Sequence, residues 1–408
     1  MPPNTSTHSS RKNVEIERLR AVAVLLLIFT HFHEIHPALP ASMRYAITGV
    51  DLFFVISGYV VTLSLLRIIR FAKADSSLTS GAAIAKRVLG IFYSKRVLRI
   101  LPAAFAWIAI SLIMAALHQG HPSQNMFGTP RQLIIEAAYF VVGFYNYLIQ
   151  FVGFPINYLG PYWSLTVEEH FYFLLPWMLL CIKSKRGRIL ATCAGIATVA
   201  VLLRPLILVP ANWVPISFEI FSSHRRFDTL LLGVLLALVF GTAAAGKTSA
   251  RIQCGAFGAK LPRIFHIIFW ASVSSTIVLC LWIARSWMST AAANGIGLTL
   301  YGLIGASLVF LSISERNRVF GIPIVGDILE YLGSRSYSMY LAHMTVINLW
   351  IAHTNFLRPS WIFESDFGRW LQLCAVLVIT VISAELSYRL IEQPFLRISG
   401  RINVKRIG

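Results

Sequence analysis

The stretch Arg20-Ala-Val-Ala-Val-Leu-Leu-Leu-Ile-Phe-Thr-His31 places two ionisable side chains at the ends of an uncharged run. The apolar segment continues to about residue 38, which gives it the length of a helix that crosses a bilayer. At a rise of about 1.5 Å per residue, His31 lies about 16 Å beyond Arg20 and returns to within about 20° of the same helix face. One face of the predicted first helix therefore joins an arginine near the cytoplasm to an imidazole near the middle of the bilayer.

The composition excludes an ordinary soluble domain. Of the 408 residues, 56% are hydrophobic and only 13% are charged, and the mean hydropathy is +0.68. Apolar runs of membrane length in such a chain indicate a bilayer protein. The formal net charge of +19 does not predict nucleic-acid binding, because the basic residues lie between apolar segments. The five cysteines are scattered without C-x-x-C spacing, so neither a disulfide framework nor a metal site is expected.

The charges that flank the apolar segments decide which of them cross the bilayer. The segments lie near residues 20–38, 43–66, 100–118, 132–152, 163–182, 189–209, 227–246, 264–284, 294–313, 331–352 and 369–391. Lys and Arg in short loops mark the cytoplasmic side. All basic clusters reach that side only if 132–152 does not cross, and Glu136, Asn146 and Gln150 interrupt this segment. The sequence predicts an all-α, polytopic membrane helix bundle of about ten transmembrane helices plus a re-entrant or interfacial segment, with both termini cytoplasmic.

One membrane domain accounts for nearly all of the chain. We expect a cytoplasmic N-terminal tail at 1–17, the membrane domain at 18–397 and a basic cytoplasmic C-terminal tail at 398–408. The stretch Ala38-Leu39-Pro40-Ala41 resembles a signal-peptide cleavage site, but the first twenty residues are polar. We therefore expect the first helix to remain uncleaved.

Ionisable side chains at membrane depth are costly and point to a functional site that faces the bundle interior. His31 leads this group, although on spacing alone it can equally be a helix-packing histidine, with Arg20 as a charge that anchors the helix end. Arg96 and Arg99 lie at i, i+3 on one helix face at the inner mouth of the third span. Their planar guanidinium groups suit phosphates, yet the pair can also be a topogenic basic cluster.

Two adjacent carboxyls, Glu168 and Glu169, enter the membrane from the outer side. No topogenic signal explains them. Neighbouring residues lie about 100° apart on a helix, so only one of the two can squarely face a given partner. A carboxylate at this depth can orient an imidazole, bind an acceptor hydroxyl or pair with a buried arginine.

Further polar residues are candidates for acceptor binding or structural support. Asp51 and Ser57 lie in the outer half of the second span, where Ser57 does not belong to a G-x-S-x-G elbow. His343 reaches mid-bilayer depth in the ninth span. Arg226 and Asp228 begin the sixth span, where they can form a local pair or contact an acceptor. The same group includes Trp163, Ser164, Tyr172 and Tyr337.

Seven blocks, taken in order, resemble the acyltransferase 3 family of integral-membrane O-acyltransferases. They are the Arg20–His31 pair, Gly49–Tyr59, Phe92–Pro102, Trp163–Pro176, Arg226–Asp228, Ser336–His343 and Ser387–Phe395. Together they run from residue 18 to about residue 397. Each block alone is weak, whereas seven in order are specific.

The resemblance implies transfer of an acyl group, usually acetyl from acetyl-CoA, to a hydroxyl group by a ten-helix protein of the bacterial inner membrane. It implies that His31 is catalytic and that Arg20, Arg96 and Arg99 bind the donor. The family often carries a C-terminal extracytoplasmic hydrolase-like domain, and this chain ends soon after Phe395. We therefore expect a stand-alone transferase whose partners are membrane lipid, acyl-CoA and a glycan or glycolipid.

The residues and the resemblance together predict a mechanism. The CoA phosphates would bind at the arginines, and neutral His31 would act as the general base near the thioester. Glu168 or Glu169 would hold the imidazole or the acceptor. Direct transfer and a two-step route through an acyl-histidine both fit these residues.

Several alternatives stay open. The acceptor can be an exopolysaccharide, an O-antigen, a lipo-oligosaccharide or a small secondary metabolite such as a macrolide. A proton-coupled transporter is the main alternative from another class, because intramembrane His, Glu and Arg also mark proton relays, although no inverted repeat is visible. A structural membrane subunit would leave the polar blocks unexplained.

Overall fold

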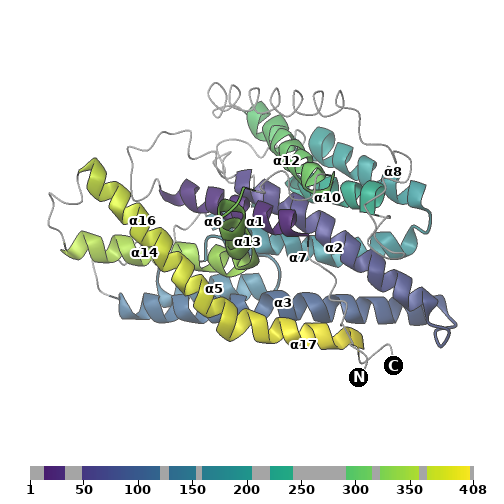
Figure 1. Ribbon diagram of the computed structural model, residues 1–408, viewed down its shortest axis with the longest axis horizontal. Helices are drawn as coiled ribbons and strands as arrows, with labels where there is room; N and C mark the ends of the chain where they lie inside the picture. The colour runs from purple at the N-terminus through teal and green to yellow at the C-terminus, as the bar shows by residue number, and fades with distance from the viewer. Residues whose placement is uncertain are drawn as a thin grey trace.

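The computed structural model describes residues 13–32, 48–119, 128–152, 159–204, 221–241, 291–314, 322–357 and 365–404. Within these ranges the secondary structure is helical and includes no β-strand (Figure 1). The longer helices are α1 (Val14–His31), α2 (Thr48–Ala74), α3 (Gly81–Leu117), α7 (Tyr162–Cys181), α8 (Lys185–Ala197), α10 (Phe227–Phe240), α12 (Ala291–Ser314), α14 (Ser336–Leu357) and α16 (Asp366–Ser387). The shorter elements are α5 (Pro130–Val141), α6 (Tyr145–Val152), η3 (Thr198–Leu203), η5 (Ser223–Arg225), α13 (Val325–Ser334), η7 (Tyr388–Glu392) and α17 (Gln393–Val404).

Four helical segments of the described chain are long and apolar enough to cross a membrane. They are Gly49–Ala74, Gly81–Leu117, Lys185–Leu203 and Phe367–Ile402. Shorter apolar helices lie at Phe227–Phe240 and Leu298–Ile313. The prediction of an all-helical membrane protein is therefore confirmed for the described residues. The number of crossings and the side of each terminus stay predictions, and the span predicted at 264–284 lies outside the described residues.

The segment predicted at 132–152 forms two short helices, α5 and α6, instead of one long helix. Thr129 and Gln132 form a reciprocal capping box at the start of α5. The chain then turns at Gly143, whose φ of 76° lies in the left-handed region that glycine adopts at low cost. Neither helix alone has the length of a bilayer. The break agrees with a segment that does not cross as a single helix, while its re-entrant or interfacial position stays a prediction.

Helices α2 and α10 pack backbone against backbone at a pair of glycines. A Cβ on Gly58 would lie 2.0 Å from the carbonyl oxygen of Leu230, and one on Gly233 would lie 2.1 Å from that of Val55. Small residues permit such a close approach between membrane helices. Because adjacent residues lie about 100° apart on a helix, Gly58 against α10 turns Ser57 toward α7.

Helix α1 lies inside the bundle, where it packs against α2, α12, α13 and α14. Its contact with α13 is also a backbone contact, since a Cβ on Gly333 would lie 1.8 Å from the carbonyl oxygen of Glu17. This contact holds the first half of α1 at a fixed depth. Arg20 follows Glu17 by one helical turn, so its position is set by the same contact.

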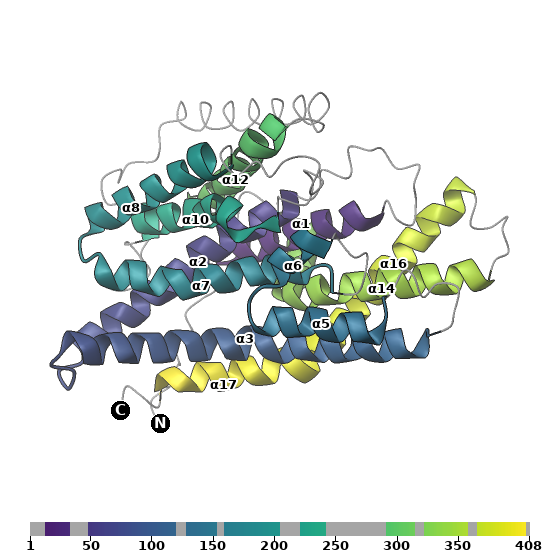
Figure 2. The ribbon, with the colours of Figure 1, turned by 180° about the vertical axis from the view of Figure 1, so that it is seen from behind.

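Helix α3 is the longest of the described helices, and α17 lies along it in both views (Figures 1 and 2). Its 37 residues exceed what is needed to cross the hydrocarbon core, which takes about 20. The helix therefore extends beyond the core at one end or both. Arg96 and Arg99 lie near its middle, and the chain continues helically through Pro102.

Candidate active site

A cavity of about 260 Å³ lies among α1, α2, α3, α7 and α14. Arginines from two helices line it, together with hydroxyl and carboxyl groups. The lining residues that the sequence had predicted as functional are Arg20, Ser57, Arg96, Arg99, Ser164, Glu168, Tyr172 and Tyr337. Residues from five separate helices thus meet at one cavity.

The basic part of the wall consists of Arg20 from α1 and of Arg96 and Arg99 from α3. Arg20 forms an ion pair with Glu17, with 3.1 Å between Nη1 and Oε2. The guanidinium of Arg96 lies 5.3 Å from the ring centroid of Tyr172, and its buried Nε has no hydrogen-bond partner among the described residues. Three guanidinium groups that line one cavity favour an anionic ligand, and planar forks suit phosphate oxygens.

Glu168 is held by two hydroxyl groups inside the cavity. The Ser57 hydroxyl donates to its Oε1 at 2.8 Å, and the Tyr172 hydroxyl donates to its Oε2. Tyr172 also lies against Arg96, so the carboxylate is linked to the basic part of the wall through an aromatic ring. Glu169 is half-buried and does not belong to the described cavity wall. The structure therefore separates the two carboxyls and places Glu168 at the site.

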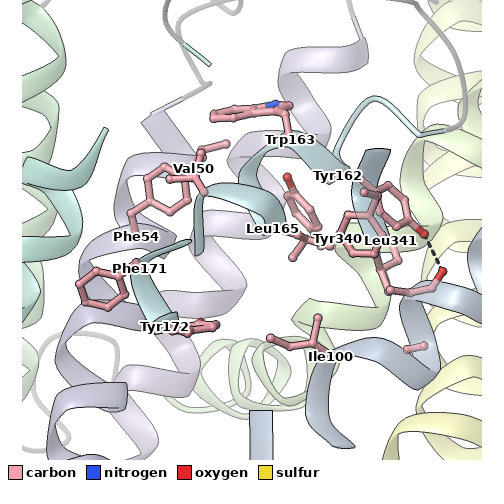
Figure 3. Close-up of a cluster of buried hydrophobic side chains, with 14 of the residues drawn as sticks. Val50, Phe54, Ile100, Tyr162, Trp163, Leu165, Phe171, Tyr172, Tyr340 and Leu341 are labelled. Carbon is pink, nitrogen blue, oxygen red and sulfur yellow. Dashed lines mark hydrogen bonds between the residues drawn. The ribbon is translucent and has the colours of Figure 1, made fainter. Parts of the chain in front are cut away.

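Tyr340 also lines the cavity, and Figure 3 shows it among the buried side chains of this region. Its hydroxyl donates to the carbonyl oxygen of Pro161 at 2.7 Å and lies 2.5 Å from the Ser164 hydroxyl, which donates to the same carbonyl at 3.3 Å. Tyr337, one turn earlier on α14, donates to the carbonyl oxygen of Ile100 at 2.8 Å. These bonds fix α14 against α3 and α7 and hold the Tyr340 ring in place.

His31 lies beyond the described cavity wall, next to His343. The two ring centroids are 5.3 Å apart, and the ring of His343 lies 5.7 Å from that of Tyr340. Tyr340 thus contacts both the cavity and the histidine pair. Arg20 and His31 do not share one open space in this conformation, although the same helix carries both.

The second polar group lies where α2 meets α10. Arg226 pairs with Asp51 at 3.0 Å, and Asp228 pairs with Arg204 at 2.5 Å, so Arg226 and Asp228 each have a partner other than each other. Thr299 of α12 also donates to Asp228 at 3.0 Å. All four charged side chains are almost fully buried.

Arg226 connects this charged group to Phe54 and Trp163, two aromatic residues that Figure 3 labels. Its guanidinium carbon lies 5.5 Å from the ring centroid of Phe54 and 5.7 Å from that of Trp163. Phe54 lines the cavity, and Trp163 precedes Ser164, which also lines it. Asp51, Arg226 and Trp163 are therefore placed to support the cavity wall.

Sequence reasoning missed Glu17, Arg204, Ser336 and Tyr340. Arg204 interrupts the apolar segment 189–209, and an arginine at that depth is itself a signal of a buried partner. Tyr340 lies within the stretch that drew attention to His343, but an aromatic residue in an apolar helix carries no signal of its own. Glu17 looked like part of the polar helix end, and its pairing with Arg20 needed only the i, i+3 rule.

The described residues thus form an all-helical membrane bundle that contains a cavity lined by three arginines. The family model described as acyltransferase domain matches residues 13–389. The chain belongs to this acyltransferase family, and the resemblance predicted from its seven blocks is confirmed.

Curated relatives carry names of the same kind. The peptidoglycan O-acetyltransferase OatA of Listeria monocytogenes is 25% identical over 408 residues, covering 98% of this chain and 58% of its own length. A Staphylococcus aureus (strain COL) protein provisionally named an O-acetyltransferase is 29% identical over 398 residues, covering 93% of this chain and 56% of its own length. The chain thus spans a little over half the length of these relatives. No solved structure matches it.

Proposed function

We propose that the chain is a membrane O-acetyltransferase that moves an acetyl group from cytoplasmic acetyl-CoA to a hydroxyl of a glycan or glycolipid. The observation that carries this proposal is that Arg20, Arg96 and Arg99, from two helices, line the same cavity. Family membership and the names of the relatives support the reaction class. The proposed location is the bacterial inner membrane, which the chain would cross several times. The basic part of the cavity wall would face the cytoplasm.

The arginines would bind the phosphates of CoA. A cavity of about 260 Å³ is at the small end for a ligand site, so it suits a narrow arm such as pantetheine better than a whole nucleotide. The nucleotide would then remain at the basic part of the wall, and the thioester would be directed past Glu168 toward Tyr340. The positive charges of the arginines would then lie beside the phosphates of the donor.

His31 would be the general base. As the acceptor oxygen attacks the thioester carbonyl, its proton moves to a ring nitrogen of His31 and a tetrahedral intermediate forms. Collapse of the intermediate breaks the C–S bond, and the departing CoA thiolate takes the proton from the imidazolium. Tyr340 lines the cavity and its ring lies against His343, so the ring would have to move before a thioester in the cavity could reach His31. A route through an acyl-histidine uses the same residues.

The acceptor is proposed to be a cell-envelope glycan, because the Listeria relative is named a peptidoglycan O-acetyltransferase. Exopolysaccharide, O-antigen and lipo-oligosaccharide belong to the same chemical class, since each offers sugar hydroxyls. A macrolide-like metabolite is the alternative acceptor. A proton-coupled transporter is the alternative function, and it predicts proton flux without loss of acetyl-CoA.

The test uses membrane vesicles from cells that produce the full chain, supplied with labelled acetyl-CoA. We expect release of free CoA and label in the extracted glycans, and we expect His31→Ala to abolish both. The matched control is His353→Ala, which alters an exposed histidine on α14. A folded His31→Ala variant with full transfer would remove His31 as the base. Proton flux without CoA release in the unaltered protein would favour the transporter.

A further inference from the structure

His31 has a second histidine as its neighbour. His343 of α14 lies with its ring centroid 5.3 Å from that of His31, and the two ring planes are inclined by 45°. At this separation a nitrogen of one ring can reach a nitrogen of the other after a small rotation. Two imidazoles from helices far apart in sequence thus meet beside the proposed reaction centre.

The backbone fixes which nitrogen of His343 carries its hydrogen. Nδ1 lies 2.6 Å from the carbonyl oxygen of Tyr340 in the preceding turn. A carbonyl oxygen only accepts hydrogen bonds, so Nδ1 is the donor. In the neutral ring Nε2 is then an unprotonated acceptor. The helix itself selects this tautomer.

Nε2 of His343 is also buried without a hydrogen-bond partner among the described residues. The whole side chain is 0% exposed. Leaving a buried acceptor unsatisfied carries a desolvation penalty, so its retention calls for an explanation such as a catalytic role. This unsatisfied nitrogen lies on the ring that neighbours His31, the base in the proposed function.

We infer that His343 is a positioning residue that accepts a hydrogen bond from His31 through Nε2. The inference rests on the proposed function. With one His31 nitrogen donating to His343, the other His31 nitrogen is left as the base that faces the acceptor hydroxyl. The arrangement assigns a tautomer to each of the two rings from a single backbone carbonyl.

The same contact supports His31 when it becomes charged. After the acceptor proton moves to His31, both of its nitrogens carry hydrogen, and the bond to His343 becomes charge-assisted and stronger. The proton then leaves with the CoA thiolate, which returns both rings to their neutral forms. No oxidant, metal or further reactant is needed.

Glu168 is less suited to this task. Its two oxygens already accept from Ser57 and Tyr172, on the part of the wall that adjoins Arg96. The orienting role that the sequence suggested for one of the paired carboxyls therefore passes to a neutral imidazole. A neutral partner also avoids placing a further charge in the bilayer interior.

The test compares two substitutions at His343 in the vesicle assay with labelled acetyl-CoA. Gln at this position retains a side-chain acceptor, whereas Phe has a ring of similar size without one. We expect His343→Phe to lower the apparent kcat about ten- to hundredfold, which is less than the roughly 10²–10⁴-fold contribution of the acid–base group itself, because His343 acts only through His31. KM for acetyl-CoA should change less than about twofold, and His343→Gln should recover a clear part of the lost kcat.

A double variant separates coupling from structure. If His343 acts through His31, adding His343→Phe to His31→Ala should lower transfer no further than His31→Ala alone. Thermal unfolding of each variant in detergent shows whether it folds. The inference is overturned by a folded His343→Phe variant with unchanged kcat, or by equal losses in the Gln and Phe variants. If His31→Ala itself retains full transfer, the proposed base has failed instead.

Discussion

Asp51 and Arg226 form an ion pair in which Oδ1 and Nη2 lie 3.0 Å apart, with both side chains no more than 2% exposed. The pair joins α2 to the start of α10, and the same guanidinium packs against the rings of Phe54 and Trp163. Removing one member of a buried pair leaves the other charge without compensation. The pair therefore controls the stability of the junction between α2 and α10 and the shape of the adjoining cavity wall.

We predict that Asp51→Asn and Arg226→Leu each destabilise the folded protein by about 3–5 kcal/mol, because each leaves a buried group of the pair unpaired. Denaturant unfolding in detergent micelles measures the loss. The double variant should lose less than the sum of the two, since it removes both charges. Additive losses would contradict a direct coupling of these two side chains.

The pair Asp75–Arg87, which lies between the spans predicted at 43–66 and 100–118, offers a control. Hydrogen bonds from Ser77, with the nearby Arg87, lower the pKa of Asp75 below its ordinary value. A lowered pKa stabilises the folded state above the ordinary value and loses this effect as the pH falls through the folded-state pKa. Because the pair is partly exposed, Asp75→Asn should have only a small effect at neutral pH, and that effect should disappear in acid. Unfolding midpoints across pH measure both.

We predict opposite effects for the same substitution at two glycines. A Cβ at Gly58 would meet the Leu230 carbonyl at 2.0 Å, so Gly58→Ala should separate α2 from α10 and cost about 1–3 kcal/mol or more. A Cβ at Gly400 in α17 meets nothing within 4 Å, so Gly400→Ala should stabilise the helix by about 0.5–1 kcal/mol. Thermal unfolding compares them. A neutral Gly58→Ala variant would show that the α2–α10 contact is looser than described.

The sequence predicted more of the cavity than of its surroundings. Intramembrane polarity drew attention to Arg20, Arg96 and the adjacent Glu168 and Glu169, because a charge at that depth needs a protein or water environment, but it did not choose between the two carboxyls. Helix periodicity then states which residues of one helix share a face. It does not state how helices are rotated against each other, so the partners Asp51–Arg226 and His31–His343 became visible only in the fold.

Rotation between helices is set by features that carry little sequence signal. Gly58 and Gly233 decide how α2 meets α10, yet a glycine in an apolar segment is compatible with many packings. For the same reason the pairing of Asp228 with Arg204, rather than with the nearby Arg226, could not be predicted from spacing. The backbone contacts set how the helices are rotated, and that rotation decides which charged side chains pair.

For the donor site we predict that Arg96→Ala and Arg99→Ala each weaken CoA binding about tenfold, since each removes a charge-assisted bond to phosphate. The matched control is Arg70→Ala, which alters an exposed arginine of α2 that does not line the cavity. Equilibrium binding of CoA in detergent measures the affinities, and raised salt should reduce the difference from the unaltered protein. If neither cavity variant alters the affinity, the phosphates bind elsewhere.

The last prediction concerns the charge of Glu168. Its carboxylate interacts electrostatically with Arg96 and Arg99, so it opposes the binding of an anion at those arginines. Glu168→Gln keeps the shape and an acceptor oxygen for Ser57 or Tyr172 but removes the negative charge. We therefore expect CoA to bind a few-fold more tightly to this variant, while kcat falls if the carboxylate contributes to the reaction.

Ser57→Ala is the matched control, because it removes one hydrogen bond to Glu168 and keeps the charge. Its CoA affinity should therefore stay within about twofold of that of the unaltered protein. Weaker CoA binding in Glu168→Gln would mean that the carboxylate holds the arginines in place through Tyr172, and that its geometric contribution exceeds its electrostatic one.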